Sequence, residues 1–333
     1  MIGLNIFKEK YFISASANRL FIKENLQTKM AHKHISIYGA LFANLAIAIM
    51  KFIAASVTRS SAMLSEGIHS SVDSVNQLLL LLGIHRSQKP AYRSHPFGHG
   101  KEIYFWSLIV SILIFGLGGG MSIYEGIKHI QHPEKLTNIY WNYVVLGSAF
   151  LFEGISFVIA IRSLNKNKSI RGSFLKRVHI SKDPSHFVVI YEDGAALAGL
   201  VIAAIGVFVG SHFNLPVADG IASIIIGLLL AFVAILLTIE SRDLLLGESM
   251  QTHEVDNIIR LVKKEKNIER MRRPLTMHMA PNDVLLAIDV QFNHKLSSTE
   301  LSETILRLEN SIRTAHPEIK RIYIEAANLT DEI

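Results

Sequence analysis

SEGIHSSVD, residues 65–73, lies within a longer apolar segment, residues 62–84. A bilayer core about 30 Å thick is crossed by roughly 20 apolar residues of helix, so this segment has the length of a membrane span. Glu66, His69 and Asp73 interrupt it at spacings of three and four residues, which places all three on one helix face. Such groups are costly at membrane depth unless they are paired, metal-bound or hydrated. The stretch therefore predicts a transmembrane helix with a polar site inside it.

The composition is typical of a polytopic membrane protein. Half of the 333 residues are apolar, and the mean hydropathy is positive. There is no cysteine, which excludes disulfides, thiolate metal sites and cysteine nucleophiles. A metal ion would have to be held by His, Asp, Glu, Asn or water.

Six segments have the length and hydropathy of membrane spans: residues 35–57, 62–84, 103–124, 141–161, 187–210 and 217–239. Before and between these spans, the Lys and Arg counts are six, one, four, two, seven and none. Because basic residues concentrate in cytoplasmic loops, this alternation predicts that both termini are cytoplasmic. It also accounts for the net charge of +6 without a nucleic-acid partner. We expect a cytoplasmic N-terminal arm at residues 1–34 and an all-α, six-helix transmembrane bundle at residues 35–240.

Residues 241–333 have the character of a soluble domain. VDNIIRLVKKEKNI has helical spacing, VLLAIDVQF alternates as a strand does, and IKRIYIEA is a second strand. STELSETILRLENSIRTAH predicts a helix with an N-terminal cap, and TMHMA predicts a third strand. We expect a small cytoplasmic α+β domain.

The candidate cation site combines two spans. His69 and Asp73 can present an imidazole nitrogen and a carboxylate oxygen to one ion, and Asp193 lies at a similar depth in the fifth span. Imidazole with two carboxylates suits zinc, iron(II), manganese or cobalt. Glu192 is adjacent to Asp193, about 100° away around the helix, so we expect one of the two to face the site and the other a neighbouring helix.

Other polar residues in the spans can be explained by structural roles as well as by a role in ion transport. Lys51 can neutralise Glu66, Glu153 or Glu192 as an internal ion pair, so Glu66 and Glu153 are candidates either for the ion pathway or for charge pairing. Asn44, Asn76 and Asp219 are expected to bond across helices. The small residues of GLGGG (116–120), GAALAG (194–199) and GIASIIIG (220–227) predict close helix packing.

Several motifs together resemble the cation diffusion facilitators. They are HSSVD in the second span, HPFGHGK at 95–101, EDGAALAG in the fifth span, ADGIASIIIG in the sixth, and SRDLLLGES before the α+β tail. The resemblance is closest to a zinc-transporter-like branch with Glu-Asp in the fifth span. It implies a homodimeric secondary transporter with a ferredoxin-like cytoplasmic domain for dimerisation. Such a protein would export a divalent transition metal, zinc being favoured, in exchange for protons across a membrane, which we expect to be a bacterial inner membrane.

The resemblance also implies particular ligands. The family's metal site falls on His69, Asp73 and Asp193, but the position of a usual fourth ligand is Val189, which makes Glu192 the favoured substitute. His99 and His95 match a second, loop-borne family site, where Tyr92 replaces the expected acidic partner. Family histidine positions of the cytoplasmic domain fall on Asp289, Ser302 and Tyr323, and His253, His278 and His294 have no evident partners, which disfavours a zinc-sensing site there.

Two other classes of function are open on the sequence alone. One is a membrane scaffold or metal-responsive regulator that transports nothing. The other is an intramembrane hydrolase with Asp73 and Asp193 as its carboxylate pair, which would leave HPFGHGK and the soluble tail unexplained. We favour the transporter, with no catalytic residues and no prosthetic group, the metal ion being its substrate.

Overall fold

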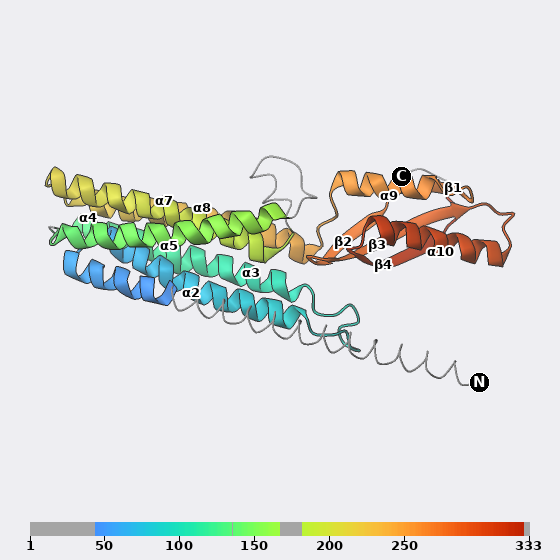
Figure 1. The fold of residues 1–333 in the computed structure, drawn as a ribbon, viewed down its shortest axis with the longest axis horizontal. Coiled ribbons are helices and arrows are strands. Elements are labelled where there is room, and N and C mark those ends of the chain that lie inside the picture. Colours follow the sequence, from blue (N-terminus) through green and yellow to red (C-terminus); the bar gives the residue numbers. More distant parts are fainter. Residues whose placement is uncertain (1–43, 135, 167–181, 330–333) are drawn as a thin grey trace, which may run out of the picture.

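A computed structural model describes residues 44–134, 136–166 and 182–329. Figure 1 shows an elongated molecule, with a bundle of long helices at one end and a smaller domain of strands and helices at the other. The predicted N-terminal arm, residues 1–34, and most of the basic loop before the fifth span lie outside the described residues.

Four helical segments are long and apolar enough to cross a membrane. They are Glu102–Gln131, Ile139–Leu164, Pro184–His212 and Val217–Leu246. The first comprises α3 (Glu102–Leu113), the π-helical η1 (Ile114–Gly120) and α4 (Met121–Gln131) in one continuous run; the others belong to α5 (Ile139–Lys166), α7 (Pro184–His212) and α8 (Val217–Leu246). These correspond to four of the six predicted spans.

The predicted count of six is not confirmed for the other two segments. The first span is described only from Asn44 to Thr58, as a shorter apolar helix. The second is the helix α2 (Ser61–Ser87), which is 27 residues long. Its buried residues include Ser65, Glu66, His69 and Asn76, and such polar side chains lower its hydropathy below that of an ordinary span. The same residues that suggest a site therefore weaken the membrane signal.

Glycines bring η1 and α4 into close backbone contact with α8. A Cβ on Gly119 would lie 3.0 Å from the carbonyl oxygen of Gly227, and one on Gly126 would lie 2.7 Å from that of Gly220. Side chains at these positions would force the helices apart, so the predicted packing role of GLGGG and GIASIIIG is confirmed. Helix α2 lies among these helices, in contact with α3, α4, α7 and α8.

The smaller domain contains every predicted helix and strand. Its elements are α9 (Thr252–Lys263), β1 (Ile268–Met271), β2 (Leu275–Ala280), β3 (Asp283–Phe292), α10 (Ser298–Ala315) and β4 (Ile319–Ala326). Strands β1 and β2 pair with successive parts of β3 in antiparallel register, and β4 pairs with β3 in parallel. Alternate residues of β3 (Val284, Leu286, Ile288 and Val290) are at most 1 % exposed, and they form one core with apolar residues of α9 and α10.

A loop of the bundle contacts the sheet domain directly. The guanidinium of Arg321, on β4, donates to the carbonyl oxygen of Phe97 at 3.0 Å and pairs with both oxygens of Asp283 at 2.6 and 2.7 Å. The Lys101 ammonium donates to the carbonyl oxygen of Leu245, at the end of α8, at 3.2 Å, and to Met277 Sδ of β2 at 3.6 Å. Gly100 is so close to β2 that a Cβ there would overlap the carbonyl oxygen of Met279. HPFGHGK, which lies in the loop between α2 and α3, therefore packs against the sheet domain.

We expect the substitution Gly100→Ala to weaken the packing of this loop against β2. The added methyl would collide with backbone rather than with a movable side chain, and overpacking of this kind costs about 1–3 kcal/mol. Hydrogen exchange of β2 in the intact protein should become faster. Gly147→Ala is the matched control, since no atom lies within 4 Å of a Cβ at Gly147; equal exchange in the two variants would contradict the contact.

Candidate metal site

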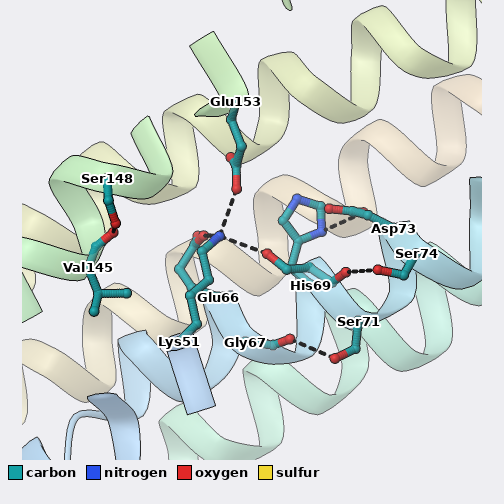
Figure 2. A network of polar contacts seen from close by, with 11 residues as sticks. Lys51, Glu66, Gly67, His69, Ser71, Asp73, Ser74, Val145, Ser148 and Glu153 are labelled. Atoms are coloured by element: carbon teal, nitrogen blue, oxygen red, sulfur yellow. Dashed lines mark hydrogen bonds and ion pairs between the residues drawn. The ribbon is translucent and has the colours of Figure 1, made fainter. Parts of the chain in front are cut away.

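The polar face of α2 is held inside the bundle. Glu66 and Asn76 are fully buried, His69 is 1 % exposed, and the Asp73 side chain is 14 % exposed. Figure 2 shows Glu66, His69 and Asp73 along this helix, with Lys51 and Glu153 approaching from other elements. The predicted arrangement of the three α2 groups on one side is therefore present.

Asp219 of α8 anchors the start of this helix. Its carboxylate accepts from the Ser60 hydroxyl at 2.6 Å, from the Ser61 backbone N–H at 2.5 Å and from the Ala62 N–H at 3.2 Å. A carboxylate at a helix N-terminus satisfies free N–H groups and complements the helix dipole. Asp219 therefore bonds across helices as predicted, and it fixes the position of the helix that carries His69 and Asp73.

Lys51 forms the ion pairs expected of it with two of the three predicted acids. Its ammonium lies 3.0 Å from Glu66 Oε2 and 2.8 Å from Glu153 Oε1, and it donates to the Ser70 hydroxyl at 2.8 Å (Figure 2). The third predicted acid, Glu192, instead accepts from the Asn76 amide at 2.6 Å. One buried cation is thus shared by two carboxylates from α2 and α5.

Four carboxyl groups surround a small cavity. Asp73, Glu153, Glu192 and Asp193, from α2, α5 and α7, line a space of about 30 Å³, together with Asn44, Ser70, Gln77 and Ser156 and three apolar residues. This volume suffices for a water molecule or a small ion. The Asp73 and Glu192 carboxyl groups contact one another, and Asp193 accepts from the Ser156 hydroxyl at 2.8 Å.

The two adjacent carboxylates of α7, Glu192 and Asp193, do not point in different directions as expected. We expected Glu192 or Asp193 to turn away from the site, but both line the cavity. Their bonds explain this arrangement, because Asn76 of α2 holds Glu192 from one side and Ser156 of α5 holds Asp193 from the other. Ser156 was not predicted, although it follows Glu153 by three residues and therefore shares its helix face.

His69 lies beside the cavity and does not line it. Its Nδ1 is 3.3 Å from Asp73 Oδ1, and neither ring nitrogen has a well-directed hydrogen bond within the described residues. No three His, Asp or Glu side chains of the described part of the chain are arranged so that they could hold a metal as they stand. The structure thus brings Asp73, Asp193 and Glu192 together, while their joint role with His69 in metal binding stays a prediction.

The two histidines of HPFGHGK belong to a stack of rings. His95 and His99 lie 4.6 Å apart between ring centroids, and Tyr92 lies 5.3 Å from His99. Backbone bonds between Tyr92 and His95 close the turn. Tyr92, which replaces the expected acidic ligand, thus has a packing role here. Metal binding by His95 or His99 stays a prediction.

The histidines of the sheet domain lie apart from the carboxyl cavity. His278 and His253 line a wider space of about 690 Å³ between the start of α7 and this domain. Burial, reinforced by the nearby Lys182 ammonium, lowers the pKa of His278. The Nδ1 of His294 is 3.9 Å from Glu269, and its side chain is exposed. The absence of a zinc-sensing site in this domain stays a prediction.

Comparison with known proteins assigns the family. The model of the cation efflux transmembrane domain matches residues 37–246. The human proton-coupled zinc antiporter SLC30A9, mitochondrial, is 33 % identical over 247 residues, 74 % of this chain but 44 % of the human protein, so the match spans under half of that relative's length. Metal tolerance protein C4 of Arabidopsis thaliana is 29 % identical over 323 residues, 95 % of this chain and 69 % of its own. The manganese efflux system protein MneP of Bacillus subtilis is 27 % identical over 288 residues, 86 % of this chain and 92 % of its own. With a family match over most of its length, the chain belongs to the cation diffusion facilitator family.

Proposed function

We propose that this protein exports a divalent transition-metal cation from the cytoplasm in exchange for protons. The observation that carries the proposal is the cavity lined by Asp73, Glu153, Glu192 and Asp193. Two of the three helices that supply these carboxyl groups, α5 and α7, are long and apolar enough to cross a membrane. Buried carboxylates attract a cation strongly, because little solvent screens them. Zinc is the favoured metal, with Asp73, Asp193, Glu192 and His69 as its ligands, since zinc binds imidazole and carboxylate together.

The coupling to protons follows from the ligands themselves. Carboxylates must be ionised and His69 neutral to bind a dication, so protons and metal compete for the same atoms. Metal entering from the cytoplasm displaces protons, and protons entering from the other side displace metal. The six spans would alternate access by rocking around this site, with the cytoplasmic domain, ferredoxin-like in type, joining two copies as a homodimer. The human relative is named as a proton-coupled zinc antiporter, which supports this scheme; we place this chain in a bacterial inner membrane.

Manganese is the second candidate. All the titratable groups that line the cavity are carboxyl groups, and His69 stands behind Asp73. Manganese prefers oxygen ligands more than zinc does. The Bacillus subtilis relative is named as a manganese efflux system protein. The two metals differ in the need for His69, so replacement of His69 by Asn should reduce zinc transport more than manganese transport.

The enzymatic alternative fits the geometry less well. A hydrolase would have to admit a peptide or lipid bond between Asp73 and Asp193, but the space of about 30 Å³ holds little more than a water molecule or an ion. A scaffold without transport would not need four carboxyl groups around one cavity, since burying them is costly.

Reconstitution into liposomes with an imposed pH gradient tests the function. Zinc, manganese, iron(II), cobalt and cadmium are offered in turn, and metal uptake is recorded with a fluorescent indicator inside the vesicles. We expect gradient-dependent uptake of zinc or manganese that stops when an ionophore collapses the gradient. Transport of none of the five metals would contradict the proposal, and uptake that ignores the gradient would contradict proton coupling.

A further inference from the structure

The two carboxylates that share Lys51 have different surroundings. Glu66 and Glu153 each give Lys51 one oxygen, at 3.0 and 2.8 Å. In each case the second oxygen is buried and has no hydrogen-bond partner among the described residues. An unpartnered buried carboxylate oxygen is costly, so its surroundings indicate what it is placed to bind.

The free oxygen of Glu66 faces the backbone of a neighbouring helix. A Cβ on Gly199 of α7 would overlap Glu66 Oε1, which shows that this oxygen lies against the Gly199 main chain. The Glu66 side chain is 0 % exposed, and Glu66 is not among the residues that line the carboxyl cavity. There is no room there for an ion.

Glu153 borders the cavity itself. It lines the space with Asp73, Glu192 and Asp193, and its side chain is 13 % exposed. Oε1 is held by Lys51, whereas the buried Oε2 has no hydrogen-bond partner among the described residues. Figure 2 shows Glu153 reaching Lys51 from α5, on the side of the pair opposite the labelled Gly67 and Ser71 of α2.

We propose that Glu153 is a direct ligand of the transported cation and that Lys51 is the residue that positions it. This inference rests on the proposed transport function and adds a group from a third helix to the site. Glu153 supplies one carboxylate oxygen from α5, in addition to the ligands proposed on α2 and α7. Lys51 keeps Glu153 oriented and offsets one negative charge of the cluster, while Glu66 serves Lys51 as a counter-ion and does not touch the metal.

Two matched substitutions separate these roles. Glu153→Gln and Glu66→Gln each remove one carboxylate from the same lysine, but only Glu153 borders the cavity. The KM and the maximal rate of zinc and manganese transport are measured in liposomes, and the affinity of the purified full chain for each metal is measured by calorimetry. Loss of a ligand should raise the KM and the dissociation constant by about 10-fold or more in Glu153→Gln. Glu66→Gln should change either constant by less than about 3-fold, and Glu153→Asp should fall between them.

Equal effects of Glu153→Gln and Glu66→Gln on metal affinity would overturn the assignment, as would an unchanged affinity in Glu153→Gln. Calorimetry keeps the test decisive if a variant transports poorly, and a single monodisperse peak in size-exclusion chromatography verifies that each variant is folded. Failure of the unsubstituted protein to transport any metal would overturn the function on which this inference rests. Transport by the unsubstituted protein with no special effect at Glu153 would overturn the inference alone.

Discussion

Metal transport should be abolished when Asp73 is replaced by alanine. Asp73 lines the cavity, lies 3.3 Å from the ring of His69 and contacts the Glu192 carboxyl group. Among the described residues, Asp73 therefore connects the imidazole of His69 with a carboxyl group of α7. Removing it takes away a ligand and leaves His69 without its neighbour, so we expect a rate at least about 100-fold below that of the unsubstituted protein. Asp193→Ala should have an effect of the same size.

Vesicle uptake of zinc and manganese measures this effect. Ser74→Ala is a suitable control on the same helix, because the Ser74 hydroxyl donates to the carbonyl oxygen of Ser70, at 3.0 Å, and Ser74 does not line the cavity. The control should transport at close to the normal rate. The oligomeric state should be the same in all variants, since Asp73 and Asp193 are in the bundle and not in the sheet domain. Normal flux in Asp73→Ala or Asp193→Ala would remove that residue from the site.

Replacing Lys51 by methionine should strongly destabilise the bundle. Lys51 is 0 % exposed and is the partner of two carboxylates, one of which, Glu66, is also 0 % exposed. Breaking a buried ion pair from one side leaves an uncompensated charge and costs about 3–5 kcal/mol. Thermal unfolding of the purified protein in detergent should therefore show a clearly lower midpoint for Lys51→Met.

The double variant Lys51→Met/Glu66→Gln is the control for this interpretation. It removes the cation together with its most enclosed partner, so about half or more of the lost stability should return. A double variant no more stable than Lys51→Met would show that the lysine stem, rather than its charge, matters. Full stability of Lys51→Met would contradict the buried ion pair itself.

The elements of the fold could largely be predicted from sequence because their signals are local. The alternation in VLLAIDVQF corresponds to β3, in which every second side chain is buried. The capping residues Ser297 and Glu300 open α10, as a Ser and a Glu at this spacing predict. The span count is harder, because α2 has polar groups on its buried face and the first span is described only in part.

The site could be predicted only in part, because helical spacing specifies one helix at a time. The positions of Glu66, His69 and Asp73 on α2 follow from the period of the helix. Glu192 accepts a hydrogen bond from Asn76, and Asp193 accepts one from Ser156. These bonds depend on how α2, α5 and α7 pack, which no local pattern encodes. The same holds for Glu153, because its ion pair with Lys51 brings together residues 102 positions apart in the chain.

Proton release on metal binding tests the central claim most directly. Zinc is added to the purified protein in weakly buffered solution near neutral pH, and a pH indicator records the protons released per zinc bound. Competition between protons and metal at the same carboxyl groups predicts release in the unsubstituted protein and a clear reduction of it in Asp73→Asn. Binding of zinc without proton release, or equal release in the two proteins, would contradict the account.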